Sequence, residues 1–288
     1  MTTPRLVERE GEAADAALVA RRAAMSAAVA ARAFRTDPPA RVLEWAGVRA
    51  LAFASDREPR ATVLHVHGGG FRLGCPEMLA PYAAALAGRT GMEVVCPGYR
   101  LAPEYPYPAG LADVWHVARA LRDGPHGERR LIVAGDSAGG GIAASLVGLL
   151  VEAGDPPAGL LLLSPWLDLT VTSPSYERNA ASDPAFSRAA ASLGARAYLC
   201  GLAPDDRRAS PLFGPVDGFP PSFISVGTGE VLIEDGRRFA RKLAEAGVAV
   251  TLSERAEMEH AAVSRNLAMP GAGDTFQEVV GFVDRILA

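Results

Sequence analysis

The segment Leu131-Ile132-Val133-Ala134-Gly135-Asp136-Ser137-Ala138-Gly139 carries the clearest structural signal in the chain. Its four apolar residues predict a buried strand, and the apolar residues after Gly140 predict a helix. Between them lies the pattern G-x-S-x-G, which places a serine on a sharp, strained turn from strand to helix. A side chain at either flanking glycine would collide with neighbouring backbone. The segment therefore predicts an α/β fold with Ser137 at the N-terminus of a helix, where N–H groups favour negative charge.

The five-residue pattern alone is weak evidence. In a chain with 30 glycines, chance gives roughly 0.2 matches to it, and a tight turn with a capping serine would read the same way. The strand before the turn and the helix after it make the match more specific. Ser137 is therefore the candidate nucleophile.

Strands and helices alternate along most of the chain. The expected strands cover residues 48–54, 62–67, 93–96, 131–134, 160–163, 222–226 and 248–252. The expected helices cover residues 76–87, 109–122, 138–151, 231–246 and about 274–287. Such alternation predicts a mostly parallel central sheet with helices on both faces. A length of 288 residues favours one such domain, residues 1–288, over two domains.

Two segments depart from this alternation. An Ala-rich stretch, about residues 10–34, predicts one helix that ends before Asp37-Pro38-Pro39. Residues 171–213 contain a polar loop, a helix at about residues 188–199 and several prolines, and they lie between two strands that one crossover could join. We expect about residues 1–38 and about residues 171–213 to form a helical cap above the sheet.

Composition excludes several classes of partner. With 29 Lys+Arg against 33 Asp+Glu the net charge is −4, so nucleic acid is not an expected partner. No uninterrupted run of roughly 18 apolar residues occurs, so no membrane span is expected. The chain has three scattered cysteines and an acidic N-terminal stretch unlike a secretion signal. These features argue against a disulfide framework and favour a cytoplasmic protein.

Three consecutive glycines follow an expected strand in His67-Gly68-Gly69-Gly70-Phe71. Glycines leave backbone N–H groups unshielded, and one such donor to the oxyanion of a tetrahedral intermediate is worth about 10²–10³ in rate. We expect the N–H groups of Gly69, Gly70 and Ala138 to form this oxyanion hole. A flexible glycine loop is the plainer alternative, whereas a phosphate-binding P-loop is excluded because no Lys-Ser/Thr follows.

His260 is the only one of the five histidines that follows Ser137. Chains with this serine turn place first the acid and then the histidine after the serine, so His260 is the candidate general base. His67 is expected to steady the glycine loop. The other histidines lie in an expected strand, helix and loop: His65, His116 and His126.

Three carboxylates compete for the role of orienting His260. Glu230 follows the expected strand at residues 222–226, at the sheet edge where such a carboxylate belongs. Asp235 lies further on, inside the next expected helix, and Asp168 follows the preceding strand. Glu230 and Asp235 would also suit a helix N-terminus. Position favours Glu230 but leaves the other two open.

In combination these motifs resemble the hormone-sensitive-lipase-like (bacterial family IV) carboxylesterases of the α/β-hydrolase superfamily. The resemblance covers roughly residues 45–288 and includes the glycine loop, the serine turn, Tyr99-Arg100-Leu101-Ala102-Pro103-Glu104 and Ser164-Pro165-Trp166-Leu167-Asp168. It implies a cap built from the N-terminus and an insertion, and short-to-medium acyl esters as substrates. It also implies the spacing that separates Glu230 from His260, although family members more often have Asp at the position of Glu230.

The residues and the resemblance together predict a serine carboxylesterase that forms an acyl-enzyme on Ser137 and hydrolyses a small-molecule ester. No cofactor and no metal is expected. Phe71 and Trp166 are expected to line the acyl pocket, although core packing suits them equally well. Lyase, dehydratase or acyltransferase chemistry on the same scaffold is the alternative. A non-catalytic binder is disfavoured because His260 is present, and a homodimer is left open.

Overall fold

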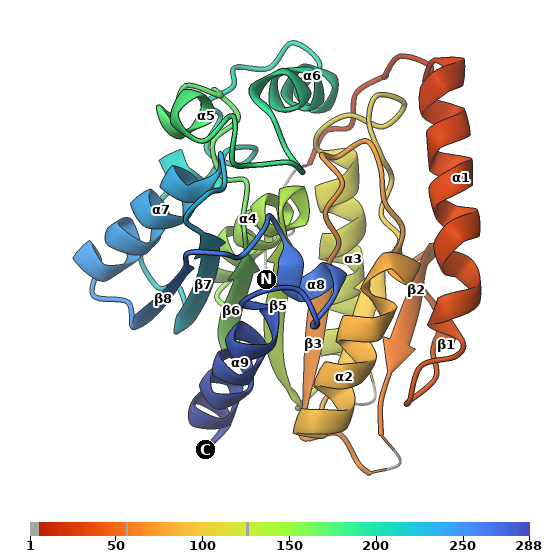
Figure 1. Ribbon diagram of the computed structural model, residues 1–288. Helices are drawn as coiled ribbons and strands as arrows, with labels where there is room; N and C mark the ends of the chain where they lie inside the picture. The colour runs from red at the N-terminus through yellow and green to blue at the C-terminus, as the bar shows by residue number, and fades with distance from the viewer. Residues whose placement is uncertain (1–5, 56, 125–126) are drawn as a thin grey trace.

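The computed structural model describes residues 6–55, 57–124 and 127–288, so His126 and residues 1–5 of the expected cap lie outside the description. The described residues form one sheet in the order β1-β2-β4-β3-β5-β6-β7-β8 (Figure 1). Its strands are β1 (Arg41–Trp45), β2 (Val48–Phe53), β3 (Ala61–Val66), β4 (Glu93–Pro97), β5 (Arg130–Asp136), β6 (Gly159–Leu163), β7 (Ser222–Gly227) and β8 (Val250–Arg255). Strands β3 to β8 run parallel, whereas β2 is antiparallel to both of its neighbours.

Helices cover both faces of this sheet, as the sequence predicts (Figure 1). One face carries α3 (Ala109–Asp123), α4 (Ala138–Glu152) and α7 (Ile233–Glu245), and the other carries η1 (Pro76–Leu79), α2 (Ala80–Thr90) and α9 (Ala272–Leu287). Along β6, Leu160 and Leu162 pack into the first layer while Leu161 and Leu163 pack into the second. Burial on both faces explains why the central strands are continuous apolar runs.

Strand β1 is absent from the sequence-based prediction. It pairs with β2 alone, at the edge of the sheet, and its residues are half-buried or exposed. An edge strand of this kind lacks the buried apolar run that marks the central strands, so its sequence gives no comparable signal.

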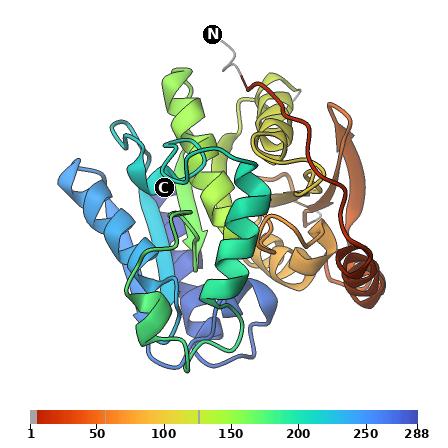
Figure 2. The ribbon, with the colours of Figure 1, turned by 90° about the horizontal axis from the view of Figure 1, so that it is seen from above.

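The N-terminal helix α1 (Ala16–Ala33) begins at Ala16 rather than at about residue 10. It packs against η1 and α2 at the side of the domain (Figure 2), and the chain before it contacts the loop after β4, where the N–H of Glu12 donates to the carbonyl oxygen of Pro103 at 3.1 Å. The Arg22 guanidinium anchors the helix by donating to the Glu104 carboxylate at 2.6 Å and to the carbonyl oxygen of Ala102 at 2.7 Å.

The insertion between β6 and β7 contains α5 (Ser175–Arg178), α6 (Arg188–Leu199) and η2 (Pro211–Phe213). It lies above the carboxyl ends of the strands (Figures 1 and 2), and its helix α6 confirms the prediction for residues 188–199. A short helix, α8 (Ala262–Arg265), follows β8. None of the helices in the described ranges is long and apolar enough to cross a membrane.

Candidate active site

Ser137 occupies the sharp turn between β5 and α4, with φ 52° and ψ −125°. This positive φ is strained for a residue with a side chain. A Cβ on Gly135 would lie 2.4 Å from the carbonyl oxygen of Gly139, and one on Gly139 would lie 2.2 Å from that of Val66. Both distances are far inside van der Waals contact, so the turn requires glycine at both positions, as the sequence pattern predicts.

A chain of two hydrogen bonds leads from Ser137 into the protein. Nε2 of His260 lies 2.9 Å from Ser137 Oγ, and its Nδ1 lies 2.8 Å from Oε2 of Glu230. All three residues are buried: Ser137 is 5% exposed, His260 is 7% exposed and Glu230 is 1% exposed. They stand at the carboxyl ends of β5, β8 and β7. A hydroxyl, an imidazole and a carboxylate in this order can activate a nucleophile.

The environment of His260 favours its charged form. Burial alone lowers the pKa of the imidazole, but the hydrogen bond and the negative charge of Glu230 oppose this, and so do the charges of Asp183 and Asp136. The net result is a pKa of His260 above its ordinary value. An imidazole that accepts a proton while a carboxylate stabilises the resulting cation suits general-base chemistry.

Ser164 is a residue of the site that sequence reasoning missed. Its Oγ donates to Oε1 of Glu230 at 2.8 Å and accepts the N–H of Ala261 at 2.9 Å. The backbone N–H of Gly227 donates to the same Oε1. Both oxygens of Glu230 are therefore engaged, and one hydroxyl joins the acid to the residue after His260. Its place at the carboxyl end of β6, next to β7, is the signal that could have drawn attention to Ser164.

The two rival carboxylates have other partners. Oδ2 of Asp235 accepts the backbone N–H groups of Leu167 at 2.8 Å and Asp168 at 2.9 Å. Burial, aided by the charge of Asp168, raises the pKa of Asp235 to about 7 against these hydrogen bonds and Arg238. Asp168 itself accepts from Nη1 of Arg238 at 2.9 Å. Both carboxylates hold the segment after β6, whereas Glu230 contacts His260.

The glycine loop adjoins Ser137. A Cβ on Gly68 would lie 3.0 Å from Cβ of Ser137, so the loop and the turn are in contact. Gly69 and Gly70 have φ of +119° and +61°, which residues other than glycine rarely adopt. Within the described residues, no carbonyl oxygen accepts the backbone N–H groups of Gly69 and Gly70. These donors therefore remain available to a substrate.

His67 holds this loop from behind, in agreement with the sequence-based expectation. Its Nδ1 donates to the carbonyl oxygen of Gly68 at 2.8 Å, and its ring stacks on Tyr99 with centroids 4.4 Å apart. The Tyr99 hydroxyl donates to the carbonyl oxygen of His67 at 2.8 Å. Burial lowers the pKa of His67, which keeps the imidazole neutral as a structural group.

Aromatic rings from the insertion close over the site. Phe71 and Trp166 are buried, with ring centroids 5.2 Å apart. Phe71 stacks on Tyr198 of α6 at 3.9 Å. Phe186 packs its ring against Trp166 at 5.3 Å and lies nearly parallel to the ring of His260 at 5.5 Å. Two of the four rings, Tyr198 and Phe186, come from the insertion, so it forms part of the wall around the candidate site.

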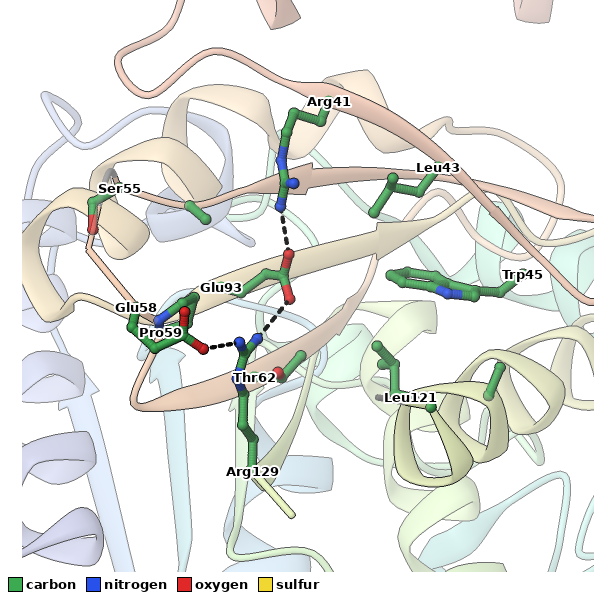
Figure 3. A pocket seen from close by; sticks show the side chains of 13 residues that line it. Arg41, Leu43, Trp45, Ser55, Glu58, Pro59, Thr62, Glu93, Leu121 and Arg129 are labelled. Atoms are coloured by element: carbon green, nitrogen blue, oxygen red, sulfur yellow. Dashed lines mark hydrogen bonds and ion pairs between the residues drawn. The ribbon is translucent and has the colours of Figure 1, made fainter. Parts of the chain in front are cut away.

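A second polar region lies at the opposite end of the sheet. It surrounds a cavity of about 510 Å³ near the amino ends of β3 and β4 (Figure 3). Glu93 accepts from Nη2 of Arg41 at 2.6 Å and lies 3.6 Å from Nη1 of Arg129, which also pairs with Glu58. Two cations and two anions thus balance each other. None of the residues that line this cavity is a histidine, so its hydroxyl groups, those of Ser55 and Thr62, have no imidazole base among the lining residues.

Comparison with known proteins identifies the family. A family model described as alpha/beta hydrolase fold matches residues 63–264. A solved structure described as a hormone-sensitive lipase from a metagenome library is 30% identical, with a TM-score of 0.85 over 92% of this chain and 91% of that chain. This chain belongs to the hormone-sensitive-lipase-like α/β hydrolases.

Two relatives of this chain are named as esterases. An esterase of Acinetobacter venetianus is 36% identical over 223 residues, which are 76% of this chain and 74% of the relative. The carboxylesterase NlhH of Mycobacterium tuberculosis is 35% identical over 230 residues, 76% of this chain and 71% of the relative. The hormone-sensitive-lipase-like chain is accordingly a carboxylic ester hydrolase, and the lyase, dehydratase and acyltransferase alternatives are not favoured.

Proposed function

We propose that this carboxylic ester hydrolase acts through an acyl-enzyme on Ser137, with His260 as general base and Glu230 as the orienting acid. The hydrogen-bonded chain from Ser137 Oγ to His260 Nε2 at 2.9 Å, and from His260 Nδ1 to Glu230 at 2.8 Å, carries the proposal. Asp235 and Asp168 are not proposed for the acid because Oδ2 of Asp235 accepts backbone N–H groups and Asp168 accepts from Arg238.

The reaction has two steps. In the first, Nε2 of His260 takes the hydroxyl proton as Ser137 Oγ attacks the ester carbonyl carbon. The tetrahedral intermediate then collapses, and His260 returns the proton to the leaving alcohol. In the second step His260 takes a proton from a water molecule that attacks the acyl-enzyme carbonyl, and it returns this proton to Ser137 Oγ as the acid leaves. Glu230 accepts from Nδ1–H throughout, which fixes the tautomer and stabilises the imidazolium.

We propose that the N–H groups of Gly69, Gly70 and Ala138 hold the oxyanion. Ala138 is the first residue of α4, so its N–H is among those without an intrahelical partner. The N–H groups of Gly69 and Gly70 lack a carbonyl acceptor within the described ranges. Preformed donors of this kind stabilise the charge that develops on the carbonyl oxygen.

The test of this proposal is the hydrolysis of p-nitrophenyl acetate and butyrate by Ser137→Ala. We expect kcat/KM to fall by at least about 10⁴-fold, because removal of a catalytic nucleophile leaves only binding and oxyanion stabilisation. Ser145→Ala, a matched change on α4, should retain wild-type rates. A fluorophosphonate should label the wild type and not Ser137→Ala. Equal hydrolysis rates in wild type and Ser137→Ala would contradict the proposal.

We also propose that Phe71 and Trp166 limit the acyl group to short-to-medium chains, and that α1 with the insertion acts as the cap. The support is the stack of Phe71 on Tyr198 and the contact of Trp166 with Phe186, which join the sheet loops to the insertion.

A series of p-nitrophenyl esters graded in acyl length tests this assignment. Trp166→Leu should shift the preferred acyl chain toward greater length, because each added methylene in an apolar pocket changes specificity by about 10-fold or more. An unchanged chain-length profile in a folded Trp166→Leu variant would show that Trp166 is a core residue only.

A further inference from the structure

Side chains of the insertion hold the loop that carries Glu230. Two donations come from Asn179 Nδ2, to the carbonyl oxygens of Thr228 at 3.0 Å and of Glu230 at 2.7 Å. Ser182 Oγ donates to the carbonyl oxygen of Gly229 at 2.9 Å. The backbone on both sides of the acid therefore depends on the insertion for its hydrogen bonds.

The residue after the acid, Val231, is held in the same way at both of its polar backbone groups. Ser175 Oγ donates to its carbonyl oxygen at 2.6 Å. Its N–H donates to Oδ2 of Asp183 at 2.9 Å. The loop and the insertion thus form one hydrogen-bonded unit, although they are separated by the whole of α6 and β7 in the chain.

Asp183 links this unit to the ring that covers His260. Its other oxygen, Oδ1, accepts the N–H groups of Ala185 and Phe186, both at 3.0 Å. Phe186 in turn lies 5.5 Å from His260, with ring planes 13° apart. Asp183 is 8% exposed, and such buried carboxylate hydrogen bonds to N–H groups are strong and directional.

We propose that Asp183 is a positioning residue for catalysis, which through Val231 fixes Glu230 and through Phe186 fixes the ring of His260. This inference rests on the proposed roles of Ser137, His260 and Glu230. On this proposal, the insertion helps to align His260 with Glu230. Misplacement of a reacting group by about 1 Å can cost about 10²-fold in rate, so these contacts bear on kcat.

The same carboxylate also contributes charge near His260. The charged and titratable groups around His260 are Glu230 from the loop after β7, Asp183 from the insertion, Asp136 from the end of β5, and Arg265 of α8, which donates to the carbonyl oxygen of His260. After Glu230, Asp183 raises the pKa of His260 further. Replacement of Asp183 by asparagine removes one of the negative charges and lowers that pKa.

The matched control is Asp206, a second aspartate of the insertion. Its Oδ1 accepts the N–H groups of Arg208 at 2.9 Å and Ala209 at 3.3 Å, the same local pattern by which Asp183 binds Ala185 and Phe186. Among the described residues it has no hydrogen bond to the Glu230 loop. Asp206→Asn therefore repeats the local change without the link to the acid.

The experiment measures kcat, KM and the pH profile of kcat/KM on p-nitrophenyl acetate. We expect Asp183→Asn to lower kcat by about 10- to 100-fold with a smaller change in KM, and to move the acidic limb to lower pH. Asp206→Asn should change neither. Asn179→Ala removes two hydrogen bonds to the Glu230 loop but no charge. It should therefore lower kcat and leave the acidic limb of the pH profile at the wild-type pH.

Several results would overturn the inference. One is a folded Asp183→Asn variant with the kcat and the pH profile of the wild type. Another is a loss of kcat in Asp206→Asn as large as that in Asp183→Asn. If circular dichroism shows Asp183→Asn unfolded, wild-type kcat in Asn179→Ala overturns it instead. Ser137→Ala in the same assay separates the two proposals. Activity retained there contradicts the acyl-enzyme, whereas wild-type behaviour of Asp183→Asn beside an inactive Ser137→Ala contradicts only the role of Asp183.

Discussion

The two ends of the sheet each bury a glutamate, and they use it differently. At the carboxyl ends of the strands, Glu230 meets an imidazole, a hydroxyl and a backbone N–H. At the amino ends, Glu93 lies between the guanidinium groups of Arg41 and Arg129 (Figure 3). The second region surrounds a cavity of about 510 Å³, yet none of the residues that line it is a histidine.

The two glutamates differ in role because their hydrogen-bond partners differ. A guanidinium keeps its proton at every pH that a protein tolerates, so the pairs of Glu93 can only hold the chain together. An imidazole changes its charge near neutrality, so the pair of Glu230 can store and release a proton. The capacity of a site for chemistry follows from such a partner and from access to a nucleophile, while cavity size alone indicates neither.

The same substitution at both ends tests whether the two glutamates differ in role. Glu230→Gln should lower kcat/KM by about 10³- to 10⁴-fold, because the amide favours the wrong tautomer of His260. Glu93→Gln should leave kcat/KM within about 2-fold and lower the free energy of unfolding by about 1–3 kcal/mol, because the Arg129 guanidinium, whose side chain is 10% exposed, loses the negative charge of Glu93. Ester hydrolysis and chemical denaturation measure the two effects. Comparable losses of activity in both variants would remove the distinction between the two ends.

The pH dependence of kcat/KM also distinguishes the two glutamates. Because Glu230 raises the pKa of His260, and the base must be neutral to act, kcat/KM of the wild type should fall as pH drops through a midpoint above about 6.5. Glu93→Gln should keep this midpoint. Glu230→Gln, measured on its residual activity, should move it to lower pH. A midpoint that is the same in all three proteins would mean that Glu230 does not act on His260.

A smaller effect on activity than that of Glu230→Gln is expected for Asp235, a buried carboxylate at the catalytic end that does not contact His260. Its pKa is raised to about 7, so its ionisation destabilises the folded state. The contribution of neutral Asp235 to the free energy of unfolding is fully present below the pKa of an unfolded aspartate, about 3.9. It is lost as pH rises from there through about 7, by roughly 4 kcal/mol in all. Asp235→Asn lacks this loss, so relative to wild type its free energy of unfolding should improve from pH 5 to pH 8. We expect kcat/KM to stay within about 10-fold, since asparagine can still accept one of the two N–H groups. A stability difference independent of pH would show that Asp235 has an ordinary pKa.

The sequence predicts those parts of the site that depend on local pattern. The strand, the two glycines and the helix around Ser137 define the turn, and the order of residues singles out His260. The central strands are recognisable because burial on both faces leaves continuous apolar runs. Position favours Glu230 over Asp235 but does not settle the choice, because both follow β7 closely and both suit a helix N-terminus.

The remaining features depend on contacts between distant segments. Ser164 and Asp183 are ordinary polar residues in their local sequence, and their importance appears only when β6, the insertion and the Glu230 loop come together. The sequence does not predict strand β1, because an edge strand buries little of its surface. The sequence predicts too early a start for α1 because alanine favours helix in any context, whereas the chain before Ala16 contacts the loop near Pro103.

The hydrogen bonds between the insertion and the Glu230 loop limit how freely this enzyme can be redesigned. Protein engineers often treat a cap as an exchangeable module that sets substrate range while the scaffold beneath supplies the chemistry. In this chain the carboxylate of Asp183 accepts hydrogen bonds both from the insertion and from the Glu230 loop, so the two cannot be separated without loss of these contacts. A grafted cap would have to bring equivalents of Asn179 and Asp183 with it, or the new substrate range would come with a misaligned acid.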